Sequence, residues 1–270
     1  MNITPHLGIG DLLIIKMKQI SNNLNIDCIN INKGLISRFC ENYEVKINFI
    51  INLIKLLFPN TKIYINNNPI NFLIFNNYSL NKTYIYDYIN NIMINVKNIY
   101  SDYIVFNSKM RYDGLMDKFT NEILEGLNIF LQNFKTSKQI IILGERNIGK
   151  NLETKTHKTI SLYNNLLLLN KNNVVVDLTN DVLTCGNPDF NNFLLDIEII
   201  NKALCNISFG IGGSFNICKA FSEKNVSFIP FYHLAPYKNI LDNMMTINNS
   251  LVENIEDLNK RICNFTVENS

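Results

Sequence analysis

The sequence predicts an α/β fold built from two Rossmann-like halves that face one cleft. Short runs rich in β-branched residues alternate with longer runs of helical periodicity, as expected for strands and helices in turn. Hydrophobic residues make up 47% of the 270 residues and charged residues 18%, enough apolar material for a sizeable core. The alternation forms two series that join near residue 100. We therefore expect domains at 1–100 and 101–250, and a terminal helix at 251–270 that could cross back to the first domain.

Periodicity predicts each element of the first half. Apolar residues recur at helical spacing over 11–21 and again over 43–58, where the second run stops before Pro59. Alternating or short β-rich runs predict strands over three further segments, namely 25–32, 62–65 and 71–75. Residues 82–100 are rich in Tyr, Ile and Asn and match neither pattern.

The second half repeats the alternation with more strongly apolar strands. Near-continuous apolar runs, typical of buried parallel strands, predict strands at 103–106, 139–144, 174–178, 206–210 and 226–231. Helical spacing predicts helices at 115–134, 159–170, 190–205, 214–224 and 251–265. A polar loop is predicted at 107–114. Ligands of doubly wound sheets bind beyond the carboxyl ends of the strands, so the strand-to-helix loops are where a site is expected.

Asparagine dominates the composition. The chain holds 48 Asn, about 18% of all residues, against three Ala, four Arg and no Trp. Asn, Ile, Lys, Tyr and Phe have A/T-rich codons, so the bias indicates an A/T-rich genome acting on an ordinary globular protein. No long polar run exists, which argues against an aggregation-prone tract. The scarce Gly and Arg residues therefore stand out, whereas any single Asn, Asn216 included, is weak evidence for a role.

Bulk charge and targeting signals exclude several classes of protein. A net charge of +2 with scattered lysines predicts no nucleic-acid partner. Residues 1–8 lack the basic segment of a signal peptide, and the most apolar window, 47–58, is too short and too interrupted to span a bilayer. The six cysteines form no Cys-x-x-Cys pair and the three histidines do not cluster with metal ligands. We expect free thiols, no bound metal and a cytoplasmic location.

A glycine-containing turn near the N-terminus leads into the first predicted helix. Within residues 6–11 (HLGIGD), Gly8 and Gly10 allow a sharp turn and Asp11 stands at the helix start. Asp11 either caps the free N–H groups of the helix or points a carboxylate into the cleft, as a general base toward a hydroxyl nucleophile. His6 borders the turn, where it could contact a substrate.

A second glycine-rich turn lies between a predicted strand and a predicted helix at 210–216 (GIGGSFN). Gly212 and Gly213 allow an anion to approach the free N–H groups at a helix N-terminus, where the helix dipole favours negative charge. Ser214 either caps the helix or donates a hydrogen bond to a phosphate. Three glycines within four residues exceed what a cap requires, so phosphate binding is favoured over a tight capped turn.

Basic and acidic residues follow two strands of the second half. Arg111 lies in the predicted polar loop and can grip a diphosphate with two parallel hydrogen bonds, while Lys109 adds a point charge or lies in solvent. Glu145 follows the strand QIIILG, where a carboxylate suits paired ribose hydroxyls. The alternative for Glu145 is a surface ion pair with Arg146 or Lys150.

In this order along the chain, the features resemble GT-B glycosyltransferases, specifically the heptosyltransferase-like group (ADP-heptose:LPS heptosyltransferases). The resemblance covers the whole chain in outline, through the Gly-x-Gly-Asp-x-Leu entry, the polar phosphate loop, the strand end IILGE and the late Gly-rich loop. Its specific matches are Gly10-Asp11-Leu12 and Gly212-Gly213. The resemblance implies a GT-B-like fold in which the first domain faces the acceptor and the second binds a nucleotide sugar.

The resemblance also implies a reaction: metal-independent, inverting transfer of a sugar from a nucleotide-diphosphate donor to a glycan or other hydroxyl acceptor, with no cofactor. Asp11 matches the catalytic Asp of the family, which activates the acceptor hydroxyl. Lys109 or Arg111 stands where the family places a basic residue on the donor diphosphate. Glu145 stands near the ribose-binding carboxylate of the family.

The chain departs from the family in its late motif. The family has Asp-Ser/Thr-Gly followed by His, whereas residues 211–216 read IGGSFN and lack both the acid and the His. Two alternatives therefore stay open: a noncatalytic nucleotide- or sugar-binding module of the same fold, or a nucleotide-sugar epimerase or pyruvyl transferase on the same layout. Composition and divergence together resemble proteins of giant amoebal viruses, which would place the protein in host cytoplasm; A/T-rich bacteria and protists share the composition.

Overall fold

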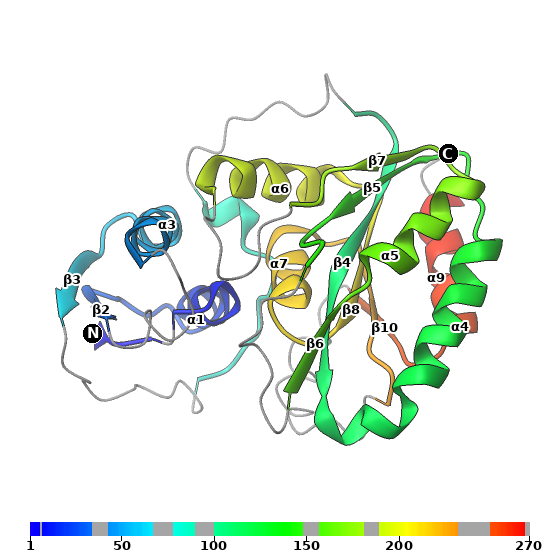
Figure 1. Ribbon diagram of the computed structural model, residues 1–270. Coiled ribbons are helices and arrows are strands. Elements are labelled where there is room, and N and C mark those ends of the chain that lie inside the picture. Colours follow the sequence, from blue (N-terminus) through cyan, green and yellow to red (C-terminus); the bar gives the residue numbers. More distant parts are fainter. Residues whose placement is uncertain are drawn as a thin grey trace.

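The computed structural model is an α/β structure with two parallel-stranded sheets (Figure 1). It describes residues 1–5, 7–33, 43–66, 78–89, 100–147, 157–180, 189–231 and 249–267. The smaller sheet comes from the N-terminal part of the chain and the larger sheet from residues after Tyr103. The α/β, Rossmann-like character predicted from the sequence is thereby confirmed.

The smaller sheet consists of β1 (Asn2–Ile3), β2 (Cys28–Asn32) and β3 (Lys62–Asn66), paired in that order and all parallel. Helices α1 (Ile9–Ser21) and α3 (Tyr43–Leu57) pack on one face of it. Each helix presents an apolar stripe at a spacing of three and four residues, which is why both could be located from the sequence.

The larger sheet has the strand order of a doubly wound, Rossmann-like α/β fold. Within the described residues the order is β10-β9-β8-β4-β5-β7, and β6 pairs separately with β4. Every pair is parallel except β4 with β6. Numbered along the chain, the parallel strands read 3-2-1-4-5-6 across the sheet, so the order reverses between β4 and β8. The strands are β4 (Tyr103–Asp113), β5 (Gln139–Leu143), β6 (His157–Ser161), β7 (Val175–Asp177), β8 (Cys205–Gly210), β9 (Asn225–Phe228) and β10 (Asn249–Val252).

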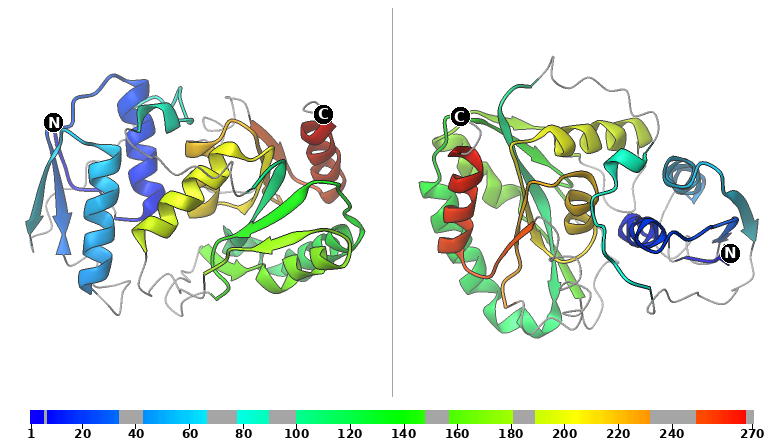
Figure 2. Two further views of the ribbon diagram at one scale, coloured as in Figure 1. Left: turned by 90° about the horizontal axis from the view of Figure 1, so that it is seen from above. Right: turned by 180° about the vertical axis from the view of Figure 1, so that it is seen from behind.

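Helices cover both faces of this sheet (Figures 1 and 2). On one face lie α4 (Thr120–Asn133), α5 (Tyr163–Leu166) and α9 (Ile255–Val267), which enclose one hydrophobic cluster. On the other face lie α6 (Phe190–Lys202) and α7 (Gly213–Phe221). Short 3₁₀ helices precede α4 at Gly114–Phe119 and follow α5 at Leu167–Lys171.

The two sheets are joined through their helices. α1 packs on α7 and α3 packs on α6, so the helices of the small sheet lie between it and the helices of the large one (Figures 1 and 2). One continuous apolar cluster runs from β1 through these helices to β4 and β5. Residues 78–89 also bridge the halves. Ser79 O–H donates to Oδ1 of Asn22, the residue after α1, at 2.8 Å, while Ile85 N–H donates to the Ala220 carbonyl of α7 at 2.8 Å and Tyr86 O–H donates to Glu198 of α6.

Three predictions of local structure were wrong. The loop expected at 107–114 is the second half of β4, whose Met110 and Tyr112 are buried on one face while Lys109 and Arg111 lie on the other. The first residues of the helix expected at 159–170 belong instead to β6. This strand pairs antiparallel with the extension of β4 and stabilises it. The terminal helix expected to begin at 251 begins at Ile255, because β10 occupies Asn249–Val252.

In these segments, pairing with a neighbouring strand determines the secondary structure, and local periodicity does not reveal it. The strand predicted at 71–75 lies outside the described residues.

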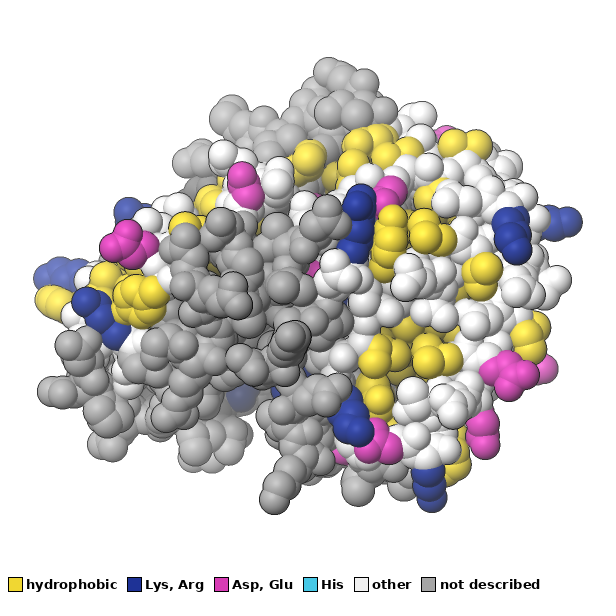
Figure 3. All heavy atoms as spheres, viewed as in Figure 1, with side chains coloured by type: hydrophobic (Ala, Val, Ile, Leu, Met, Phe, Trp, Pro, Cys, Tyr) yellow, Lys and Arg dark blue, Asp and Glu magenta, His cyan; other side chains and the backbone are white. Residues whose placement is uncertain are grey.

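The surface of the larger half carries charges of both signs. On the face seen in Figure 3, the basic and acidic side chains of the described residues are interspersed with hydrophobic ones over α4 and α5. Within the described part of the chain, no helix has both the length and the hydropathy required to cross a bilayer. The terminal helix α9 packs on β8, β9 and α4 of the larger half.

Candidate functional site

The candidate site lies where the strand order reverses, at the carboxyl ends of β4 and β8. Arg111 of β4 and Gly210 of β8 are register partners, and Ile211 N–H donates to the Arg111 carbonyl at 2.5 Å. Gly210 has a φ of 65°, and a Cβ atom at this position would lie 2.0 Å from that carbonyl oxygen. Glycine is required here because any side chain would force the two strand ends apart.

The N-terminus of α7 begins directly beyond this contact. Gly212 is the N-cap residue with a φ of 109°, and a Cβ atom on it would lie 2.7 Å from Cδ of Arg111. A Cβ atom on Gly213 would meet no atom of the described residues within 4 Å, so there is open space beside Gly213 at the start of the helix. Ser214 lies inside the helix, so of the two alternatives for this residue the helix cap was wrong. Gly212 takes that position because only glycine readily adopts its backbone conformation.

Arg111 supplies positive charge at this helix end. Its side chain is half-buried, and the structure gives its guanidinium no hydrogen bond or ion pair with any described residue. Its Nε is buried without a partner. The free N–H groups of α7 and its dipole add partial positive charge beside the guanidinium. Together these groups favour an anion with several acceptor oxygens, such as a phosphate or diphosphate.

The N-terminus of α1 meets the same place from the small sheet. A Cβ atom on Gly10 would lie 2.7 Å from Nδ2 of Asn216, so the two helices touch at these residues. The exposed Asp11 follows, with its carboxylate oxygen 2.6 Å from where a Cβ atom on Gly8 would lie. Gly8 is the N-cap and Asp11 the third helical residue, so Asp11 is not the N-cap itself. The two glycine-rich turns, 200 residues apart in sequence, are thus neighbours in space.

His6, the remaining residue predicted in the first turn, lies outside the described residues.

No family model, curated protein or solved structure matches this chain. The argument for a function therefore rests on the geometry and charge of the site.

Glu145 and Lys109 form an ion pair on the same face of the sheet as Arg111. Lys109 Nζ lies 3.3 Å from Glu145 Oε2, and both side chains are largely buried. Burial raises the pKa of Glu145, while Lys109 and then Lys46 of α3 act in the opposite direction. Glu145 thus pairs with Lys109. The alternative of an ion pair with Arg146 was wrong, and Lys150, the other partner considered, lies outside the described residues.

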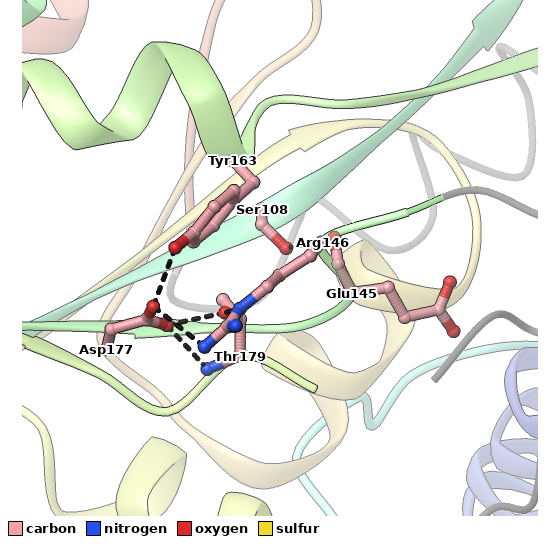
Figure 4. A network of polar contacts seen from close by, with 6 residues as sticks. All are labelled: Ser108, Glu145, Arg146, Tyr163, Asp177 and Thr179. Carbon is pink, nitrogen blue, oxygen red and sulfur yellow. Dashed lines mark hydrogen bonds and ion pairs between the residues drawn. The ribbon is translucent and has the colours of Figure 1, made fainter. Parts of the chain in front are cut away.

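A separate network holds the backbone at Glu145 in place (Figure 4). Ser108 and Ser161 both donate hydroxyl hydrogen bonds to the Glu145 carbonyl, at 2.9 and 3.0 Å. Arg146 bonds Asp177 at 3.1 Å and stacks over Tyr163, whose hydroxyl donates to the same carboxylate at 2.9 Å. The Glu145 side chain points away from this network. The network fixes the strand end and leaves the Glu145 carboxylate to Lys109.

We expect Lys109→Met to destabilise the protein by about 1–2 kcal/mol at pH 7, because it leaves a largely buried carboxylate without its cation. The pKa of Glu145 should rise further, and NMR titration of its carboxyl can measure this. A raised folded-state pKa means that ionising the carboxyl costs stability. The loss should therefore be full at neutral pH and shrink as the pH falls below that pKa. Chemical denaturation of wild type and variant, at pH 7 and at a pH below the folded-state pKa of Glu145, measures the difference. The double variant Lys109→Met/Glu145→Gln should recover most of the loss, and an equally unstable double variant would contradict the explanation.

Proposed function

We propose that the protein is a glycosyltransferase that uses a nucleotide-diphosphate sugar. The observation that carries the proposal is Arg111, whose guanidinium has no partner among the described residues and whose side chain lies against Gly212 at the N-terminus of α7. Gly213 leaves room there for a phosphate. The strand order supports it too, because doubly wound sheets bind nucleotides at the point of reversal.

In the proposed reaction Asp11 acts as the general base. It accepts the proton of the acceptor hydroxyl while the oxygen forms a bond to the anomeric carbon of the donor. The bond from that carbon to the diphosphate oxygen breaks, and the nucleoside diphosphate leaves with the electron pair. Arg111, Lys109 and the first turn of α7, from Gly212 through Gly213 and Ser214, stabilise the leaving negative charge. Attack opposite the leaving group inverts the anomeric centre.

The remaining site residues fit the donor and the acceptor. In this scheme Glu145, which lies beside Lys109 just beyond β5, accepts hydrogen bonds from ribose hydroxyls. Gly8 and Gly10 allow the acceptor to approach the N-terminus of α1 closely. His6 precedes them in the chain and belongs to the proposed acceptor side. In this scheme the small sheet and α1 bring the acceptor, and the larger half brings the donor.

One observation favours a second candidate function, a noncatalytic nucleotide-binding module. The Asp11 carboxylate folds back over Gly8 in the first turn of its own helix, a position that suits stabilisation of the helix N-terminus. A binding module would retain nucleoside-diphosphate affinity but would not turn over a nucleotide sugar. An assay of slow donor hydrolysis in water separates the two functions. A transferase should release nucleoside diphosphate from the nucleotide sugar, and a binding module should not.

Removal of the Arg111 charge should weaken nucleoside-diphosphate binding by about 10–100-fold, the scale of a lost charge-assisted hydrogen-bond pair. Arg111→Met retains the aliphatic contact with Gly212 and removes only the guanidinium. Calorimetry with UDP, GDP and ADP measures the effect. Arg261→Met on the exposed surface of α9 is the matched control and should bind as the wild type does. Equal affinity of Arg111→Met and the wild type would remove Arg111 from the site.

A further inference from the structure

Asn216 occupies the contact between the two helix ends of the site. It lies in the first half of α7, and its Nδ2 is the atom that a Cβ on Gly10 would strike at 2.7 Å. The residue is only 8% exposed. The residue is therefore largely buried, and its contact with Gly10 places it where the proposed acceptor and donor sides meet.

The side-chain amide of Asn216 makes no hydrogen bond to any described residue, whereas its backbone N–H donates to the carbonyl of the N-cap residue Gly212 at 2.9 Å. Neither amide atom is among the buried side-chain atoms that lack a partner, so both retain contact with solvent. A mostly buried amide without a protein partner is unusual, because such groups are normally satisfied within the fold. The exposed edge of this amide is thus free to bond a molecule held between the helix ends.

The chemistry of the neighbours indicates what that molecule presents. The N-terminus of α7 and Arg111 offer only donors and positive charge, which suit phosphate oxygens. Asp11 offers only acceptors, which suit a hydroxyl losing its proton. An amide offers one donor and one acceptor group, a combination that complements a hydroxyl that is retained. In an inverting transfer, the sugar lies between the base and the leaving diphosphate, which is where Asn216 is found.

We propose that Asn216 recognises the transferred sugar through a hydrogen bond to one of its hydroxyls, and so makes the site select a nucleotide sugar over the bare nucleoside diphosphate. This inference rests on the proposed function, since it assumes that the donor diphosphate binds at α7. Asn216 is here a specificity residue and takes no proton in the reaction. Gly10 leaves room for the Asn216 amide, because a larger residue at this position of α1 would displace the amide.

The test compares two affinities for each variant. Calorimetry is carried out with the pairs UDP and UDP-glucose, GDP and GDP-mannose, and ADP and ADP-glucose. The pair that wild type binds most tightly is then used for Asn216→Ala. We expect about a tenfold weaker affinity for the nucleotide sugar and an unchanged affinity for the nucleoside diphosphate, as for loss of one hydrogen bond to a neutral hydroxyl. Asn165→Ala on α5, a partly buried Asn that bonds Asn128 away from the site, is the matched control.

A second variant guards against an effect of folding. Gly10→Ala places a methyl group against Nδ2 of Asn216 while favouring the helix, and should show the same selective loss. Equal losses for both ligands in Asn216→Ala would show that the amide binds the diphosphate, which overturns the sugar assignment. If Asn216→Ala prefers the nucleotide sugar over the nucleoside diphosphate as strongly as wild type does, the sugar assignment is overturned as well. If wild type binds none of the six ligands, the proposed function itself fails together with this inference.

Discussion

Replacement of Asp11 by asparagine is expected to lower the rate of sugar transfer by about 10²–10⁴-fold, the contribution of a positioned general base. Asparagine has nearly the same size and can occupy the same place above Gly8, but it cannot accept the proton of the acceptor hydroxyl. Because the donor diphosphate contacts α7 and Arg111 in the proposed site, nucleoside-diphosphate affinity should stay within about twofold of wild type. Turnover is measured by release of nucleoside diphosphate and affinity by calorimetry.

The control for Asp11→Asn is Glu44→Gln, an exposed acid in the first turn of α3. It sits in the equivalent turn of the neighbouring helix and should leave turnover unchanged. Retained turnover in Asp11→Asn would remove the base assignment and favour the structural role of the carboxylate. A parallel loss of turnover and of nucleoside-diphosphate binding would show instead that the substitution disturbs the contact of α1 with α7.

Much of the fold follows from local pattern. The buried strand β5 is a nearly uninterrupted apolar run, and α1 and α3 carry apolar stripes, because burial imposes a pattern on the sequence. The extension of β4 could not be predicted in this way. Its residues Lys109 and Arg111 are polar, and the segment is extended because β6 pairs with it from 48 residues further along the chain, as the register of Arg111 with Thr159 shows.

Parts of the candidate site were also predictable. Gly212 and Gly213 stood out because A/T-rich composition makes glycine scarce, and the structure places them at a helix N-terminus beside Arg111. The closeness of the two glycine-rich turns follows from packing of α1 on α7, which no local pattern encodes. Asn216 was obscured by the abundance of asparagine, and Lys46 by its place in an ordinary amphipathic helix. Only three-dimensional contacts single these residues out.

Lys219 escapes sequence analysis for a similar reason, since lysine is normally a surface residue. In α7 it is completely buried, and its Nζ has no hydrogen-bond partner among the described residues. Its Nζ lies 5.3 Å from the ring centroid of Phe215, one turn earlier in the helix. Burial lowers the pKa of Lys219 from 10.5 to about 7, against a smaller opposing effect of Cys218. The folded protein therefore holds an amine that is partly neutral at physiological pH.

This burial is costly. In the unfolded chain the amine is fully protonated at pH 7, so folding must either release the proton or bury the charge. A fall in pKa from 10.5 to about 7 corresponds to about 4 kcal/mol of lost stability at pH 7, at roughly 1.4 kcal/mol for each tenfold factor. Between about pH 7 and 10.5 the unfolded chain binds the proton that the folded protein lacks, so stability should rise with pH. Below about pH 7 both states bind it and the penalty is constant.

Lys219→Met is accordingly expected to stabilise the protein at pH 7, by about 2–4 kcal/mol, because methionine fills a similar volume without a charge to bury. It should also remove the Lys219 part of the rise in stability between pH 7 and 10.5. Chemical denaturation at several pH values measures both effects, and Lys171→Met at an exposed position is the control that should show neither. Lys219→Arg should prevent stable folding, since a guanidinium cannot lose its charge. A Lys219→Met variant less stable than wild type at pH 7 would show that the amine has a partner that outweighs its burial.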